Sequence, residues 1–194
     1  MANKDAAFGM KPVRMIGGAP YTGGTSRYRI AANYGTSIFQ GDMVAQVTGG
    51  TVEVHADGGT VPIVGVFNGC QFTDPTSGEQ EFSNFYPAST NASDIIAFII
   101  DDPNVVYEVQ ADDTFPVADL FGNFDIVYTS AGSTLTGISG AELDVTTGAT
   151  ATTLPIKAID ISQDPNNDDV ASANTNVLVV IQNSIYGVKG AGLA

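Results

Sequence analysis

The sequence predicts an all-β fold, with a single β-sandwich or β-barrel body and an extended N-terminal arm. Short apolar or alternating runs recur between Gly, Pro, Asn and Asp residues, as they do in proteins built from many short strands. No window longer than about ten residues places its apolar residues at helical spacing. Charged residues make up only 14% of the chain, against roughly 25% in typical globular proteins.

Eight segments have the composition of strands. In VVYEVQ, which begins at Val105, every second side chain shares one face of the strand, so Tyr107 and Glu108 point to opposite sides. The expected strands span residues 42–47, 51–55, 63–72, 95–100, 105–109, 126–128, 154–161 and 177–181.

Turn residues separate these segments. Gly49 and Gly50 tolerate the positive φ of a tight hairpin turn between two strand-like runs. The sequence DDPN at residues 101–104 ends one apolar segment and starts the next, because Pro103 lacks an amide donor and Asp and Asn favour turns. One short helical turn is expected over residues 116–121, with Gly122 as the C′ glycine that ends it.

The charge of the chain divides it into two segments. Residues 1–29 hold five of the seven Lys and Arg residues and a single acid, Asp5, whereas the net charge of the whole chain is −14. No Lys or Arg occurs between Ile30 and Ile156. We therefore expect a basic, Gly- and Pro-containing arm over residues 1–29 and an acidic β-rich body over residues 30–194.

The arm has the composition of a segment that becomes ordered on a partner. Its glycines and prolines disfavour independent folding, while its apolar side chains can anchor and its cations can contact an acidic surface. A disordered leader with no role is the alternative. The residues predicted to form the interface with this partner are Lys11, Arg14, Met15, Ile16, Tyr21, Arg27, Tyr28 and Arg29.

The chain offers no enzyme signature, so we expect neither a catalytic residue nor a cofactor. His55 is the only histidine and stands at a hairpin end, where an exposed strand residue is expected. Cys70 is the only cysteine and has the setting of a small core residue. A catalytic triad or a zinc site within one chain would need more of these residue types.

The acidic residues do not form a recognisable metal motif. In DPNNDD, Asp164, Asn166 and Asp168 alternate as in a calcium loop, but Asp169 replaces the turn glycine and Thr175 replaces the bidentate Glu. A turn stabilised by Asp and Asn side chains is therefore expected, and calcium binding is left open.

Two further acidic pairs occur at residues 101–102 and 112–113, which are all aspartate. Either a hairpin brings the two pairs together as a cluster, or the acids are simply solvated, as paired acids at strand ends usually are. The acidic composition also disfavours direct binding to nucleic acid, and no apolar run is long enough to span a bilayer.

Several longer segments resemble structural proteins of tailed bacteriophages, especially marine and cyanobacterial phages. These segments follow one another over most of the chain, and the run from Phe85 to Asp112 is the most distinctive. They read DAAFGMKPV, YRIAANYGTSIFQGD, VGVFNGCQFTDPTSG, FYPASTNASDIIAFIIDDPNVVYEVQAD and GISGAELD.

The resemblance implies a decoration or cement protein on the surface of an icosahedral capsid. Members of this class often have a β-rich body, form trimers and brace joints between major capsid proteins. We accordingly expect two partners, the major capsid protein and further copies of the chain, with assembly in the host bacterial cytoplasm. The alternative is a receptor- or carbohydrate-binding module of the virion, in which Phe82, Phe85 and Tyr86 would stack on sugars.

Overall fold

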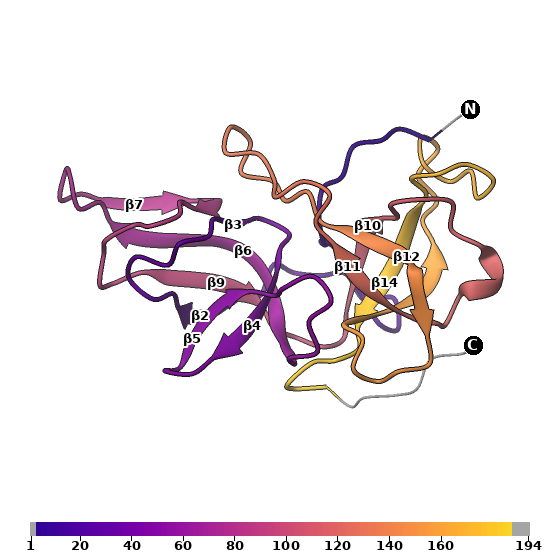
Figure 1. Cartoon of the computed structure of the whole chain (residues 1–194), viewed down its shortest axis with the longest axis horizontal. Helices are drawn as coiled ribbons and strands as arrows, with labels where there is room; N and C mark the ends of the chain where they lie inside the picture. Colours follow the sequence, from indigo (N-terminus) through magenta and orange to yellow (C-terminus); the bar gives the residue numbers. More distant parts are fainter. Residues whose placement is uncertain (1–2, 188–194) are drawn as a thin grey trace.

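The computed structural model describes residues 3–187 and has an all-β architecture. Two six-stranded antiparallel sheets pack as a sandwich-like body, and a two-stranded sheet accompanies them (Figure 1). Among the described residues there is no α-helix, and a single 3₁₀ turn spans Val117–Asp119. The predicted all-β body is confirmed.

The first sheet curls back on itself. Its strand order is β1-β10-β14-β13-β11-β12, and a bridge between Ala111 and Leu143 brings β12 close to the end of β10. The amide of Asp112 also donates to the carbonyl of Leu143, at 3.0 Å. The strands span Lys11–Met15 (β1), Val105–Gln110 (β10), Asn123–Val127 (β11), Glu142–Ala149 (β12), Ile156–Ile161 (β13) and Asn176–Ile181 (β14).

The second sheet is built around the longest strand, β6. Its order is β2-β9-β6-β4-β5, and β7 pairs with the C-terminal half of β6. Strands β3 and β8 form the separate two-stranded sheet. The strands span Ser26–Arg29 (β2), Ile38–Phe39 (β3), Met43–Val47 (β4), Thr51–Val54 (β5), Ile63–Thr73 (β6), Gln80–Ser83 (β7), Phe85–Tyr86 (β8) and Ile96–Ile100 (β9).

All eight predicted strands are present, with ends shifted by a few residues. The predicted hairpin also forms, with φ of 106° at Gly49 and 76° at Gly50 between β4 and β5. The helical turn is shorter than expected and ends differently, because Phe121 rather than Gly122 takes the positive φ, at 69°. Six strands were missed: β1, β2, β3, β7, β8 and β12.

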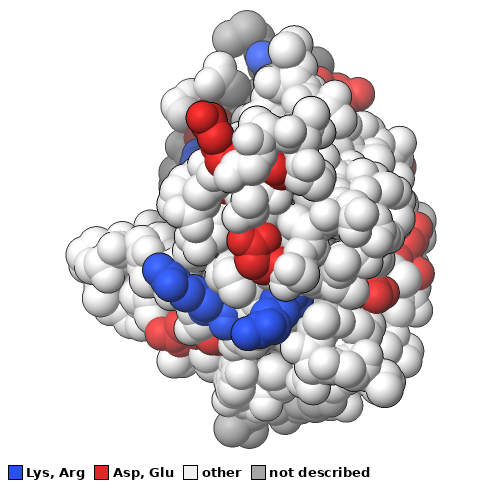
Figure 2. All heavy atoms as spheres, turned by 90° about the vertical axis from the view of Figure 1, so that its left-hand side faces the viewer, with Lys and Arg blue, Asp and Glu red and all other residues white. Residues whose placement is uncertain are grey.

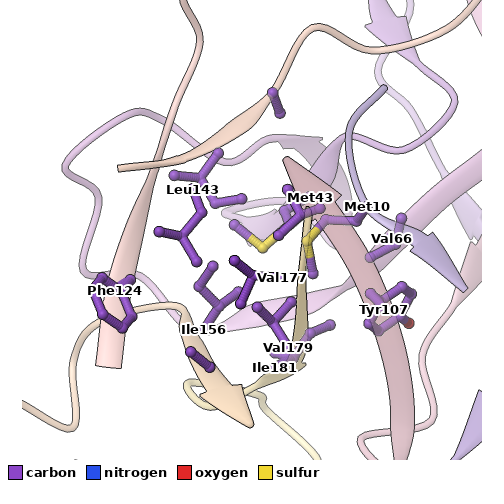
Figure 3. Close-up of a cluster of buried hydrophobic side chains, with 14 of the residues drawn as sticks. Met10, Met43, Val66, Tyr107, Phe124, Leu143, Ile156, Val177, Val179 and Ile181 are labelled. Carbon is purple, nitrogen blue, oxygen red and sulfur yellow. The ribbon is translucent and has the colours of Figure 1, made fainter. Parts of the chain in front are cut away.

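The two large sheets share one apolar core. The larger buried cluster combines side chains of the first sheet with Met43, Val66 and Ile100 of the second. Figure 3 shows Met43 and Met10 beside Leu143 and Val177 in this cluster. A second cluster, which includes Phe67 and Tyr86, is formed mainly by buried side chains of the second sheet and of the two-stranded sheet. The larger cluster therefore joins the two sheets, because part of the apolar surface of each is buried against the other.

A buried carboxylate fixes the turn between β3 and β4. Asp42 is 1% exposed, and its Oδ2 accepts the amide of Phe39 at 2.7 Å. Its Oδ1 accepts the hydroxyl of Ser139 at 2.5 Å, which joins the turn to residues 130–140. Burial raises the pKa of Asp42 from 3.8 to about 6, although both hydrogen bonds act in the opposite direction.

We predict that Asp42 makes the fold less stable as the pH rises from about 4 to about 6. The folded state holds the Asp42 proton more tightly than the unfolded chain, so the stabilisation is complete below pH 4 and is lost as the pH rises through the folded pKa. The Asp42→Asn variant mimics the protonated form. Its free energy of unfolding, measured in urea relative to the parent chain, should rise by up to about 3 kcal/mol over this range.

Asp94→Asn is the control with the opposite sign. Hydrogen bonds from the Thr73 side chain and backbone lower the pKa of Asp94, so its stabilisation is present at neutral pH and lost on acidification. A flat or falling difference between Asp42→Asn and the parent chain above pH 4 would contradict the prediction.

Candidate interaction surfaces

The N-terminal segment, residues 3–29, lies along the body and supplies two strands to it. Its first residues are held by buried amide side chains. Gln110, which is 1% exposed, accepts the amide of Ala6 at 2.9 Å and donates to the carbonyl of Lys4 at 2.8 Å. Asn167 donates to the same Lys4 carbonyl at 2.8 Å. The alternating pattern of β10 places Glu108 and Gln110 on one face of the strand, and both side chains bond to the N-terminal segment.

The segment then passes close to the turn between β3 and β4. Met10 is buried, and its amide donates to the carbonyl of Gly41 at 2.9 Å. Gly9 has φ of 68°, and a Cβ there would lie 2.6 Å from the Cβ of Ser139. A larger residue at position 9 would therefore separate the segment from the turn.

Strand β1 begins with a charged contact to β10. Lys11 lies opposite Glu108 in the ladder, and its Nζ is 3.2 Å from Oε2 of that buried carboxylate. Ser162 donates a short hydrogen bond to the other carboxylate oxygen, and the side-chain Nδ2 of Asn176 donates to it at 3.4 Å. Glu108 therefore joins β1, β10, β14 and the residue that follows β13, and the Lys11 side chain, which is 63% exposed, pairs with it from the surface.

The rest of β1 and the turn after it expose mixed side chains. Arg14 is half-buried and donates to the carbonyl of Met15, while Ile16 is 54% exposed. The amide of Met15 donates to the carbonyl of Ala19, so the chain folds back along the end of β1. Met15 and Tyr21 line an open hollow of about 360 Å³ together with Asp101 and Asp102.

Strand β2 presents two contrasting faces. Tyr28 points inward, where its hydroxyl donates to Asp101 at 2.8 Å and lies 2.9 Å from the hydroxyl of Tyr186. Arg27 and Arg29 point outward and are exposed. The end of the molecule at the left of Figure 1 carries two neighbouring groups of cationic side chains, with acidic groups nearby (Figure 2). Within residues 3–187, neither arginine forms an ion pair.

The structure thus separates the predicted interface residues into three groups. Lys11, Met15, Tyr21 and Tyr28 have internal contacts. Arg14 and Ile16 lie at the end of β1, and Arg27 and Arg29 lie on the outer face of β2. The described part of the segment pairs with its own body, rather than projecting as a free arm. Residues 1–2 of the arm and 188–194 of the body lie outside the described residues.

The single histidine and the single cysteine of the chain are both buried. His55 is 2% exposed rather than exposed, which corrects the sequence expectation. Its backbone amide donates to Met43, and burial lowers the pKa of its imidazole. Cys70 lies in the core as expected, where burial raises the pKa of its thiol to about 12. A thiol with this pKa is not an effective nucleophile at neutral pH.

The acidic pairs do not meet. Residues 101–102 precede β10 and residues 112–113 follow it, so the two pairs lie at opposite ends of that strand. Asp164 accepts the backbone amide of Asn166 at 3.0 Å, which confirms the expected Asx-type turn. Among residues 3–187, no group of three or more His, Cys, Asp or Glu residues is arranged to hold a metal ion.

The aromatic residues considered for sugar binding are mostly internal. Tyr86 is fully buried, stacks on Tyr34 and donates to the carbonyl of Tyr34 at 3.1 Å. Phe85 stacks on Phe39. Only Phe82 is freely exposed, at 67%. The three rings therefore do not form a common stacking platform.

Comparisons of the chain with protein families, curated proteins and solved structures find no match. No helix within residues 3–187 is long and apolar enough to cross a membrane.

We predict that Gln110→Leu releases residues 3–8 from the body. The substitution removes the acceptor of the Ala6 amide and one donor to Lys4, and losing buried hydrogen bonds of this kind costs about 1–3 kcal/mol. Hydrogen exchange followed by mass spectrometry should show faster exchange in residues 3–8 with little change in the core. Gln46→Leu, at an exposed position of β4, is the matched control. Unchanged exchange in Gln110→Leu would mean that other contacts hold the segment.

Proposed function

We propose that the chain is a structural protein of a tailed-phage virion that decorates the outside of the capsid and stabilises it. In this role it bridges neighbouring subunits of the major capsid protein and associates with further copies of itself, as a homotrimer. It acts without a cofactor or catalysis and binds neither nucleic acid nor a membrane. It is assembled onto the capsid in the host bacterial cytoplasm.

The observation that carries this proposal is the distribution of cations on the folded chain. The segment that holds five of the seven Lys and Arg residues forms strands β1 and β2 on an otherwise acidic body. Arg14, Arg27 and Arg29 have no ion pair within residues 3–187. Cationic side chains without an internal counter-charge suit contact with an acidic protein surface.

The end of β1 is the part of this segment best suited to the capsid. Strand β1 lies at the edge of the first sheet, and Val13 and Ile16 are about half exposed beside Arg14. Pro12 lacks a backbone donor, which limits strand addition along this edge. The contact is therefore made mainly by side chains, with Ile16 as the apolar anchor and Arg14 as the charged partner. Many weak contacts of this kind on one shell add up through multivalency.

We predict that Arg14→Glu combined with Ile16→Ser lowers capsid occupancy at least tenfold. The pair removes the anchor and reverses the charge while leaving the β1–β10 ladder in place. The measurement is the number of copies bound to purified capsids that lack the chain, by quantitative mass spectrometry, with the heat stability of the capsids as a second readout.

The matched control is Lys4→Glu combined with Val61→Ser, since Lys4 is exposed, Val61 is 50% exposed, and neither residue belongs to β1. Point substitutions are used because a deletion of residues 1–27 would also remove Met10 from the core and so would disturb folding. Full occupancy by the Arg14→Glu/Ile16→Ser protein would overturn the β1 contact. Absence of the parent chain from capsids would overturn the proposed function.

A further inference from the structure

The outer face of the second sheet carries a continuous row of side chains. Register across four strands places Arg29 opposite Ile96, Ile96 opposite Gln71, and Gln71 opposite Phe82. Directly paired residues project from the same face of a sheet. Arg27 lies opposite Phe98 in the next row, where Gly69 adds no side chain. We call this surface the arginine face; its residues are Arg27, Arg29, Gln71, Phe82, Ile96 and Phe98.

The arginine face has the composition of an interface. Ile96 and Phe98 are half-buried, and Phe82 is 67% exposed at the outer end of the row. The guanidinium of Arg27 lies 5.8 Å from the ring centroid of Phe98, a cation–π arrangement that leaves the outward side of the guanidinium available. Arginine and aromatic residues are enriched where protein interfaces concentrate their binding energy.

The opposite end of the molecule has complementary chemistry. The 3₁₀ turn lies at the right of Figure 1, far from β2 and β7. Val117 and Phe121 are about half exposed there, and Asp113 and Asp119 are exposed. We call these four residues the acidic turn. Beside Asp119 the surface is hollowed into a cleft of about 120 Å³, lined also by Thr146, Gly122 and Gly148.

Phe121 is held in an unfavourable backbone conformation. Its φ of 69° lies in the left-handed region, which is uncommon for a bulky residue and costs about 1–3 kcal/mol. Its amide donates to the carbonyl of Ala158 at 2.9 Å, so the conformation is fixed from the body. The positive φ falls on Phe121 and not on the neighbouring Gly122. The strained backbone thus holds a phenyl ring that is 50% exposed to solvent.

We propose that the arginine face of one copy binds the acidic turn of a second copy. Arg27 and Arg29 pair with Asp113 and Asp119, and the ring of Phe121 packs against Phe82 and Phe98. The argument for a second copy is charge complementarity: the chain carries both a cationic and an acidic apolar surface, each without an ion pair within residues 3–187.

The contact is head to tail, because the two surfaces lie at opposite ends of the molecule. Such heterologous contacts generate a closed ring if the rotation between copies closes, and an open chain if it does not. This inference deepens the proposed self-association by naming its two surfaces, and it is tested without capsids.

The test uses the full chain and sedimentation equilibrium. The parent protein should associate at about 0.1 M salt and weaken at least tenfold at about 1 M salt, since screening shortens the range of charge interactions. Arg27→Glu/Arg29→Glu and Asp113→Arg/Asp119→Arg should each be monomeric. A mixture of the two variants should associate again, because each retains one intact surface and their two reversed surfaces also match.

Two further variants separate association from folding and from capsid binding. Phe121→Gly relieves the positive φ, so it should keep the melting temperature within a few degrees while weakening association at least tenfold. Lys4→Glu/Arg14→Glu reverses the same number of charges as Arg27→Glu/Arg29→Glu and should associate like the parent chain.

A monomeric parent chain at all concentrations would overturn the proposal, even if capsid occupancy remained high. Unchanged association of either charge-reversed variant, or failure of their mixture to associate, would show that other surfaces join the copies. Loss of capsid occupancy alone would count against the proposed function and not against this contact.

Discussion

The pairing of the N-terminal segment with strands β9 and β10 is the constraint on which the structure depends. Buried backbone amides and carbonyls need partners. Along one edge of β10 and one edge of β9, residues 11–15 and 26–29 supply them. Buried Gln110 and Glu108 add side-chain bonds to the same segment. The segment with the composition of a loose arm is therefore a component of both sheets. The cations on it become fixed features of the surface, which is what gives the two proposed contacts their geometry.

Periodicity predicted the strands that line the core and missed those that do not. Segments such as 63–72 and 105–109 were found because their apolar residues are the core. Strands β7 and β12 read QEFS and ELDVTTGA, in which polar residues face water or buried partners and leave no clear alternation. The two short strands β3 and β8 contain too few residues to show a period. Strands β1 and β2 are short and lie in a segment rich in glycine and proline, so their sequences show no strand pattern. They form because they pair with β10 and β9.

The sequence identified some residues of the candidate surfaces, but it did not predict how those residues are arranged in space. Charge asymmetry along the chain identified Arg27 and Arg29, and Phe82 was considered only together with Phe85 and Tyr86, as a residue that would stack on sugars. Only the register from β2 through β9 and β6 to β7 places these side chains on one face. Likewise, nothing local to residues 113–121 indicates that Phe121 takes a positive φ beside a glycine. Such features depend on pairings between distant segments, and a single sequence does not report them.

The long-range pairing of the N-terminal segment also governs how the chain can be made. Lys11 bonds to a residue 97 positions later, and Asn3 bonds to residues more than 160 positions later. The ribosome therefore produces this segment before its partners in β9, β10 and the 167–175 loop. Topologies dominated by such distant contacts fold slowly, and strand edges left open in the meantime promote aggregation. Residues 3–29 are thus translated before the strands they pair with, and they are among the last that can complete their native contacts.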